Sequence, residues 1–272
     1  MDASGIGDVE RPLSPVERAV RNETAQRVAI VVILILVWEG YARWLNYALL
    51  FPTFTATLNA AFEDAGELAL RIGTTMRVLL IGYATGLACA AVFTMLAVAS
   101  EAGARLLSTL TAMFNPLPAI ALLPLALIWF GLGTPSLVFV IAHSVLWAVA
   151  LNTLTGFRAV PETLRMSGRN LGLWGPRYVA LILIPAAFPS ILTGLKIGWA
   201  FAWRTLIAAE LVFGASSRSG GLGWYIFAAR SELETARVFA GLLIVIVIGL
   251  LVEAVIFRTV EARTVKLWGM QQ

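Results

Sequence analysis

The sequence predicts an all-α protein, a polytopic membrane helical bundle with about six transmembrane helices. Of its 272 residues, 59% are hydrophobic and only 13% are charged, and the mean hydropathy is +0.84. A soluble domain carries about a quarter charged residues. Several uncharged runs reach the ~20 residues that a helix needs to cross the hydrocarbon. The lipid bilayer is therefore the first partner that we expect.

Charge and cysteine content narrow the function further. The formal net charge is +4 and the pI is about 9.6. The basic residues are scattered around apolar runs instead of being gathered with aromatic residues, so we expect no nucleic-acid partner and interpret the excess as membrane topology. The single cysteine, Cys89, excludes an intrachain disulfide and a cysteine-based metal cage. We expect no metal site.

The chain divides into a cytoplasmic N-terminal segment (1–27), a transmembrane domain (28–257) and a cytoplasmic C-terminal tail (258–272). The first apolar run begins at Val28 after a long charged region, and no small-residue cleavage site follows it. We therefore expect an uncleaved signal anchor that ends near residue 46.

The second span is expected at Val78–Ser100, which carries no charge. Gly82 and Gly86 give it a face of small residues that suits close helix packing. The preceding segment, 47–74, is expected outside the membrane with an amphipathic helix on the surface. Glu101–Arg105 is expected to form a tight inner turn.

The stretch Leu106–Phe157 contains no Asp, Glu, Lys or Arg and is too long for one crossing. We place the break between spans three and four at Gly131–Pro135. Pro116, Pro118 and Pro124 remove hydrogen bonds from span three. This pattern has two interpretations, a kinked helix that faces a pathway and a buried structural kink.

Span five, from about Leu181 to Phe213, carries Lys196, Arg204 and Glu210. Charges inside a membrane are costly and normally face a bundle interior or an aqueous cavity. The remaining expected segments are an outer loop with a short helix over 214–236 and a sixth span over Val238–Phe257.

The distribution of basic residues predicts the orientation. Twelve of the 20 Lys and Arg residues fall in segments that are inside when the amino terminus is inside, and four fall in outer loops. This is the positive-inside bias. It places both termini and segment 157–180 in the cytoplasm.

Segment 157–180 is a basic island between apolar runs. Pro161 and Glu162 favour a helix start, and Gly172 can end that helix in a left-handed cap. Its non-polar face is predicted to be Leu164, Gly168 and Leu171, and its other face Arg165, Arg169 and Asn170. A cytoplasmic docking loop is one interpretation, and the basic inner loop of any multi-span protein is the other.

The same segment resembles the cytoplasmic Glu-Ala-Ala loop of bacterial ABC importer permeases. Met166-Ser167-Gly168 stand where Glu-Ala-Ala would, Gly172 is the matching glycine, and Ile182–Pro185 matches the family's exit from the loop. The acidic first residue of that motif is absent here. An ionic contact from that position is therefore not expected.

The resemblance covers about residues 28–268. The pieces Asn115–Pro118, Ile128–Gly133, Leu192–Gly198, Ala208–Leu211 and Gly221–Gly223 look like permeases of the nitrate, sulfonate, taurine and bicarbonate group. Each piece alone is weak, but their order and spacing together are specific.

This resemblance implies a machine in the bacterial inner membrane with two copies of this chain, two cytoplasmic ABC ATPase subunits and an extracytoplasmic solute-binding protein. In that family the ATPase binds ATP and Mg. We therefore expect that this chain is not an enzyme and holds no cofactor. Consistently, the sequence has no G-x-x-x-x-G-K-[ST] phosphate loop. The residues expected to couple to the ATPase, in a coupling loop over 157–180, are Pro161, Glu162, Arg165, Met166, Ser167, Gly168, Asn170, Leu171, Gly172 and Trp174.

The residues expected along a translocation pathway are Pro118, Pro124, Trp129, His143, Trp203, Arg204 and Glu210. A fixed cation at Arg204 would favour an anion such as a sulfonate or nitrate. Arg204 has two structural alternatives, an ion pair with Glu210 and a contact with a lipid head group. His143 has one, a hydrogen-bonded packing role.

Three alternative functions remain at this point. An ion-coupled secondary transporter often contains an internal inverted repeat, and none is convincing here. An intramembrane enzyme needs paired catalytic groups, and a single His and a single Cys supply few. An importer of the same type could also carry an uncharged heterocycle or vitamin precursor.

Overall fold

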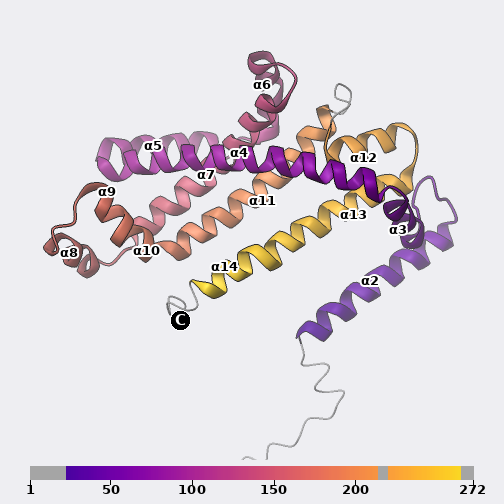
Figure 1. Ribbon diagram of the computed structural model, residues 1–272, viewed down its shortest axis with the longest axis horizontal. Coiled ribbons are helices and arrows are strands. Elements are labelled where there is room, and N and C mark those ends of the chain that lie inside the picture. Colours follow the sequence, from indigo (N-terminus) through magenta and orange to yellow (C-terminus); the bar gives the residue numbers. More distant parts are fainter. Residues whose placement is uncertain (1–22, 214–219, 265–272) are drawn as a thin grey trace, which may run out of the picture.

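A computed structural model of the chain describes residues 23–213 and 220–264 (Figure 1). Within these ranges the regular structure is helical and no strand occurs, which confirms the predicted all-α fold. Four helical segments are long and apolar enough to cross a membrane. They are α2 (Glu23–Leu45), α4 (Ala65–Ala99), α7 (Thr134–Arg158) and α13 (Thr235–Leu251) with its continuation η3 (Val252–Phe257) and α14 (Arg258–Arg263).

Two bent pairs of helices bring the number of candidate spans to six. The first joins α5 (Glu101–Phe114) to η1 (Ala119–Leu122) and α6 (Leu123–Phe130) across a bend of 88°. The second joins α9 (Gly175–Tyr178), η2 (Val179–Leu183) and α10 (Ile184–Ala186) to α11 (Phe188–Phe213) across a bend of 80°. Prolines lie at or beside both breaks, where they remove backbone donors. The third span is thus broken more sharply than the kink expected from its prolines.

Helix α7 forms the centre of the bundle, because α4 and α11 both pack along it. A Cβ atom at Gly82 would lie 2.7 Å from the Cβ of Ile141, and one at Gly86 would lie 2.6 Å from the Cβ of Val145. The two glycines therefore let α4 approach α7 more closely than larger residues would allow. This confirms the predicted small-residue face of the second span.

Helix α2 diverges from this bundle along most of its length and contacts α3 (Phe54–Glu63) and α13 near its end (Figure 1). Its Trp38 donates a hydrogen bond to the carbonyl of Pro52 at 2.9 Å. The same ring contacts Phe54 and Phe239 at centroid distances of 5.5 and 5.6 Å. Most other large side chains of α2 are exposed, as suits a helix surrounded by lipid or by another chain.

Several expected boundaries were wrong. The helix expected within 47–74 is present as α3, but the helix of the second span, α4, starts at Ala65 and not at the expected Val78. The turn expected at Glu101–Arg105 is the start of α5, because the Ser100 hydroxyl caps that helix by accepting from the Gly103 N–H at 3.0 Å. The last span continues as helix to Arg263 instead of ending at Phe257.

Other expectations are confirmed. Helix α7 begins just after Gly133, with a proline in its first turn. The short helix expected in 214–236 is α12 (Leu222–Ser231), whereas residues 214–219 of that loop lie outside the described ranges. Helices α8 (Glu162–Asn170) and α9 lie at one end of the long axis, and α3 and α12 lie towards the other (Figure 1).

Candidate translocation cavity and coupling loop

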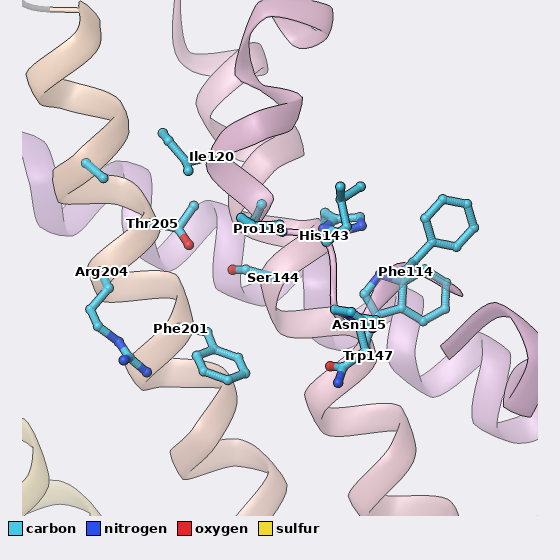
Figure 2. A pocket seen from close by; sticks show the side chains of 14 residues that line it. Phe114, Asn115, Pro118, Ile120, His143, Ser144, Trp147, Phe201, Arg204 and Thr205 are labelled. Carbon is cyan, nitrogen blue, oxygen red and sulfur yellow. The ribbon is translucent and has the colours of Figure 1, made fainter. Parts of the chain in front are cut away.

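A cavity of about 330 Å³ lies at the break that follows α5, between α7 and α11 (Figure 2). The break brings Asn115 and Pro118 to the cavity, α7 brings His143 and Ser144, and α11 brings Arg204. The remaining lining residues are Phe114, Pro116, Leu117, Ala119, Ile120, Trp147, Phe201, Thr205 and Ala208. Three of the seven predicted pathway residues therefore meet in one cavity.

Arg204 is the cationic side chain on this wall. Its Nε donates to the carbonyl of Ala200 at 3.0 Å, and its guanidinium carbon lies 5.1 Å from the centroid of the Phe201 ring. Among residues 23–213 and 220–264, no carboxylate forms an ion pair with Arg204. Both close contacts come from α11 itself, and Figure 2 shows Arg204 and Phe201 on that helix. The positive charge is thus left uncompensated beside the cavity.

His143 lies among aromatic rings. Its ring centroid is 6.2 Å from that of Phe114 and 6.0 Å from that of Trp147. Phe114 and Trp147 themselves stack at 5.5 Å. In the described part of the chain, neither ring nitrogen of His143 has a hydrogen-bond partner. This arrangement does not match the hydrogen-bonded packing role that the sequence left open.

The other four predicted pathway residues do not line the cavity. Pro124 lies in the first turn of α6, and Trp129 is exposed on the same helix beside Phe139. Trp203 is buried in the core, and Glu210 is buried against Thr75. The ion pair between Arg204 and Glu210 is therefore not formed.

Lys196, the third intramembrane charge, also lies outside the cavity. Its Nζ forms an ion pair with Glu261 of α14. This contact ties the first half of α11 to the last helical segment that the structure describes.

Sequence reasoning missed several lining residues that lie one helical turn or less from predicted ones. Ser144 and Trp147 follow His143 by one and four positions, and Phe201 and Thr205 flank Arg204. Residues three or four apart share a helix face. Helical spacing around the two predicted anchors is the signal that could have found them.

The coupling loop is built around α8, whose end is set by Gly172. This glycine has a positive φ of 71°. The N–H of Leu173 donates to the Gly168 carbonyl at 3.1 Å, and the N–H of Gly172 donates to the Arg169 carbonyl at 2.9 Å. These two bonds form a Schellman motif, which terminates the helix at a defined residue. The predicted left-handed cap is confirmed.

Arg165 fixes the start of α8 to the end of α7. Its guanidinium donates to the carbonyls of Phe157 and Val160, which lie at the end of α7 and just beyond it. Glu162 lies between Arg165 and Arg169, with its carboxylate oxygens 3.8 Å from each. The loop is therefore joined to the central helix by a side chain and not only by the backbone.

The predicted non-polar stripe of α8 is divided between two faces. Gly168 is buried, and a Cβ atom there would lie 2.9 Å from Ile182. Leu171 is 75% exposed and Trp174 is 69% exposed. Of the other predicted coupling residues, Pro161, Glu162, Met166, Ser167, Asn170 and Gly172 are exposed. The loop thus presents large apolar side chains on its outer surface.

Comparisons with known proteins agree with this architecture. Residues 82–264 match the family described as "Binding-protein-dependent transport system inner membrane component". An aliphatic sulfonates transport permease protein of Bacillus subtilis (named as putative) is 30% identical over 222 residues, covering 80% of this chain and 78% of that protein.

Two further relatives extend over more of the chain. A putative ABC transporter permease protein of Methanocaldococcus jannaschii is 29% identical over 238 residues, or 85% of this chain and 88% of that protein. The nitrate import permease protein of a Synechocystis strain is 27% identical over 252 residues, or 89% of this chain and 90% of that protein. The apolar and broken helices and these matches lead to one conclusion: the chain is a multi-pass membrane protein that belongs to the family of binding-protein-dependent ABC transport permeases.

Proposed function

We propose that this chain forms the translocation pathway of an ATP-driven importer for a small anion. The observation that carries the proposal is Arg204, a cation beside the cavity with no described carboxylate to compensate it. An exposed arginine on the wall of a cavity, with no carboxylate to compensate it, attracts anions and so favours an anionic ligand. The nitrate and aliphatic sulfonates in the names of the relatives are anions, which agrees with this assignment.

Energy enters through the coupling loop in this proposal. Leu171 and Trp174 are exposed apolar side chains on a loop that a Schellman cap and Arg165 hold in place. Exposed apolar groups of this kind mark protein interaction sites. The occupant that we propose is an ABC ATPase, since the chain itself has no phosphate-binding loop.

The assembly that we propose contains a second copy of this chain, two ATPase subunits and an extracytoplasmic solute-binding protein. ATP and Mg are then bound by the ATPase alone, and this chain converts closure of the ATPase dimer into a rearrangement of its helices. Such a chain works as a two-state element whose equilibrium is biased at the loop. The helices, the bent pairs and the membership of the permease family support this assignment.

The test is to replace Leu171 by Glu and to ask whether an ATPase still co-purifies with the chain. A charge in the exposed apolar surface should abolish co-purification and ATP-dependent uptake of nitrate or an aliphatic sulfonate into proteoliposomes. Leu233→Glu is the matched control for co-purification, because Leu233 is 69% exposed, close to the 75% of Leu171, but lies just beyond α12 and far from the loop. Uptake by the chain alone, driven by an ion gradient without ATP, would contradict the proposal.

A further inference from the structure

The first turn of α12 is capped by two other helices. Its N-cap residue, Gly221, has no side chain that could satisfy the free N–H groups of that turn. Instead the N–H of Leu222 donates to the hydroxyl of Thr75 on α4 at 2.8 Å. The N–H of Gly223 donates to the carboxylate of Glu210 on α11 at 2.9 Å.

Thr75 and Glu210 are also bonded to each other. The Thr75 hydroxyl donates to the Glu210 carboxylate at 3.0 Å while it accepts from Leu222. Thr75 is fully buried, and Glu210 is 4% exposed. Burying a carboxylate is costly unless hydrogen bonds compensate it, so these groups depend on each other. We call Glu210, Thr75 and the amides of Leu222 and Gly223 the α12 clamp.

The glycines of this turn are required by the clamp. A Cβ atom at Gly221 would lie 2.0 Å from the Thr75 hydroxyl and 2.2 Å from a Glu210 carboxylate oxygen. A Cβ atom at Gly223 would lie 2.5 Å from the Cβ of Glu210. The backbone of α12 therefore touches both side chains directly, which any larger residue would prevent.

Arg71 holds the same turn from one helical turn earlier on α4. Its Nη1 donates to the Gly220 carbonyl at 2.9 Å, and its guanidinium carbon lies 4.0 Å from the Trp224 ring centroid. Helix α12 is thus joined to α4 and α11 by buried polar contacts.

Helix α11 bears the clamp on one face and the cavity on another. Glu210 follows Arg204 by six residues, which on an ideal helix is about 9 Å along the axis and about 240° around it. Phe201, Arg204 and Thr205 line the cavity, whereas Glu210 does not. A movement of α12 that is transmitted through Glu210 therefore reaches the cavity wall within two helical turns.

We propose that Glu210 and Thr75 are positioning residues that make α12 and α11 move as one body, so that a partner pressing on the α12 end displaces the cavity wall that carries Arg204. This inference rests on the proposed function, because the partner is the solute-binding protein of that assembly. It gives Glu210 a role away from the solute.

The first measurement follows hydrogen exchange of the full chain in lipid nanodiscs. Glu210→Gln removes one acceptor oxygen, and Thr75→Val removes the hydroxyl at nearly constant volume. Both should speed exchange in peptides covering 220–231 at least tenfold, while α7 stays unchanged. Thr75→Ser keeps the hydroxyl and is the matched control. Wild-type exchange in Thr75→Val would overturn the clamp.

The second measurement follows ATP hydrolysis by the complex, which is isolated with its ATPase through a tag on this chain. MgATP is supplied, and the solute-binding protein is titrated in. Glu210→Gln and Thr75→Val should keep basal ATP hydrolysis within twofold and lower its maximal stimulation by the binding protein at least fivefold. Full stimulation despite faster exchange would show that the clamp is only structural and would overturn the proposal.

The two measurements separate the two proposals. A wild-type chain that isolates without any ATPase contradicts the proposed function, and hydrogen exchange then decides the clamp alone. Should Glu210→Gln yield no folded protein, Thr75→Val answers the same question with a smaller change, and Thr75→Ser shows whether the hydroxyl is the required group.

Discussion

At the scale of single residues, the charge of Arg204 has no carboxylate partner among the residues that the structure describes. We expect Arg204→Gln to lower anion uptake by about tenfold or more, since a hydrogen bond to a charged group contributes about 1.5–3 kcal/mol. Arg204→Lys keeps the charge but loses the planar guanidinium, so its uptake should lie between that of the wild type and that of Arg204→Gln. Uptake of nitrate or an aliphatic sulfonate into proteoliposomes measures both. Unchanged uptake by an intact Arg204→Gln complex would remove the solute contact.

Tyr225 on α12 provides a test by pH. Its hydroxyl donates to Asp64 at 2.6 Å. Burial, and to a smaller extent this hydrogen bond, raises the pKa of Tyr225 above its ordinary value. A folded-state pKa above the unfolded value of about 10 stabilises the protein below pH ~10, and this contribution is lost as the pH rises further. The thermal unfolding midpoint in detergent should therefore fall above pH ~10.

Tyr225→Phe should flatten that fall, because it removes the titrating group, although it lowers the midpoint at neutral pH by the loss of one hydrogen bond. The matched control is Tyr47→Phe at an exposed position. A decline of equal steepness in Tyr225→Phe and the wild type would show that Tyr225 is not its source.

At the scale of elements, the contact between α4 and α7 depends on glycine. Gly82→Ala places a Cβ atom 2.7 Å from Ile141, whereas a Cβ atom at Gly73 on the same helix meets nothing within 4 Å. Overpacking costs about 1–3 kcal/mol, while Ala for Gly in an open helical position gains up to about 1 kcal/mol. Gly82→Ala should lower the thermal unfolding midpoint, and Gly73→Ala should raise it or leave it unchanged. Equal effects would contradict the packing account.

The sequence was sufficient to predict where the helices occur but not the directions in which the broken ones run. Uncharged length identifies a crossing, yet the bends of 88° and 80° depend on how the broken segments pack against α7. The start of α5 was missed because Ser100 is at once the end of one helix and the cap of the next. A charged run that follows a serine such as Ser100 can form a new helix when the serine hydroxyl accepts a hydrogen bond from the first turn.

The site was predicted in part for a similar reason. Pro118, His143 and Arg204 are rare residue types in an apolar stretch, and all three line the cavity. Trp203 and Glu210 looked equally unusual, but their helix phase turns them away from the cavity. The positions of residues around α11 predict which side chains face the cavity only when the helix that α11 packs against is known.

At the scale of the whole molecule, the two segments for which we propose partner contacts lie towards opposite ends of the long axis. The coupling loop lies at one end, and α12 with its clamp lies towards the other (Figure 1). Arg165 joins the loop to α7, and Glu210 joins α12 to α11. Both joined helices contribute side chains to the cavity. A displacement at either end would therefore reach the cavity through one continuous helix.

This arrangement requires that the two ends face opposite sides of the membrane, which cysteine labelling can decide. In a Cys89→Ser background, Leu171→Cys tests the coupling loop and Leu233→Cys tests the α12 end, since both positions are largely exposed. The excess of basic residues near the loop predicts that it is cytoplasmic. In intact spheroplasts an impermeant maleimide should therefore label Leu233→Cys at once and Leu171→Cys only after permeabilisation. Labelling of Leu171→Cys from outside would place the loop where no cytoplasmic ATPase can bind, and labelling of both from one side would exclude transmission along the axis.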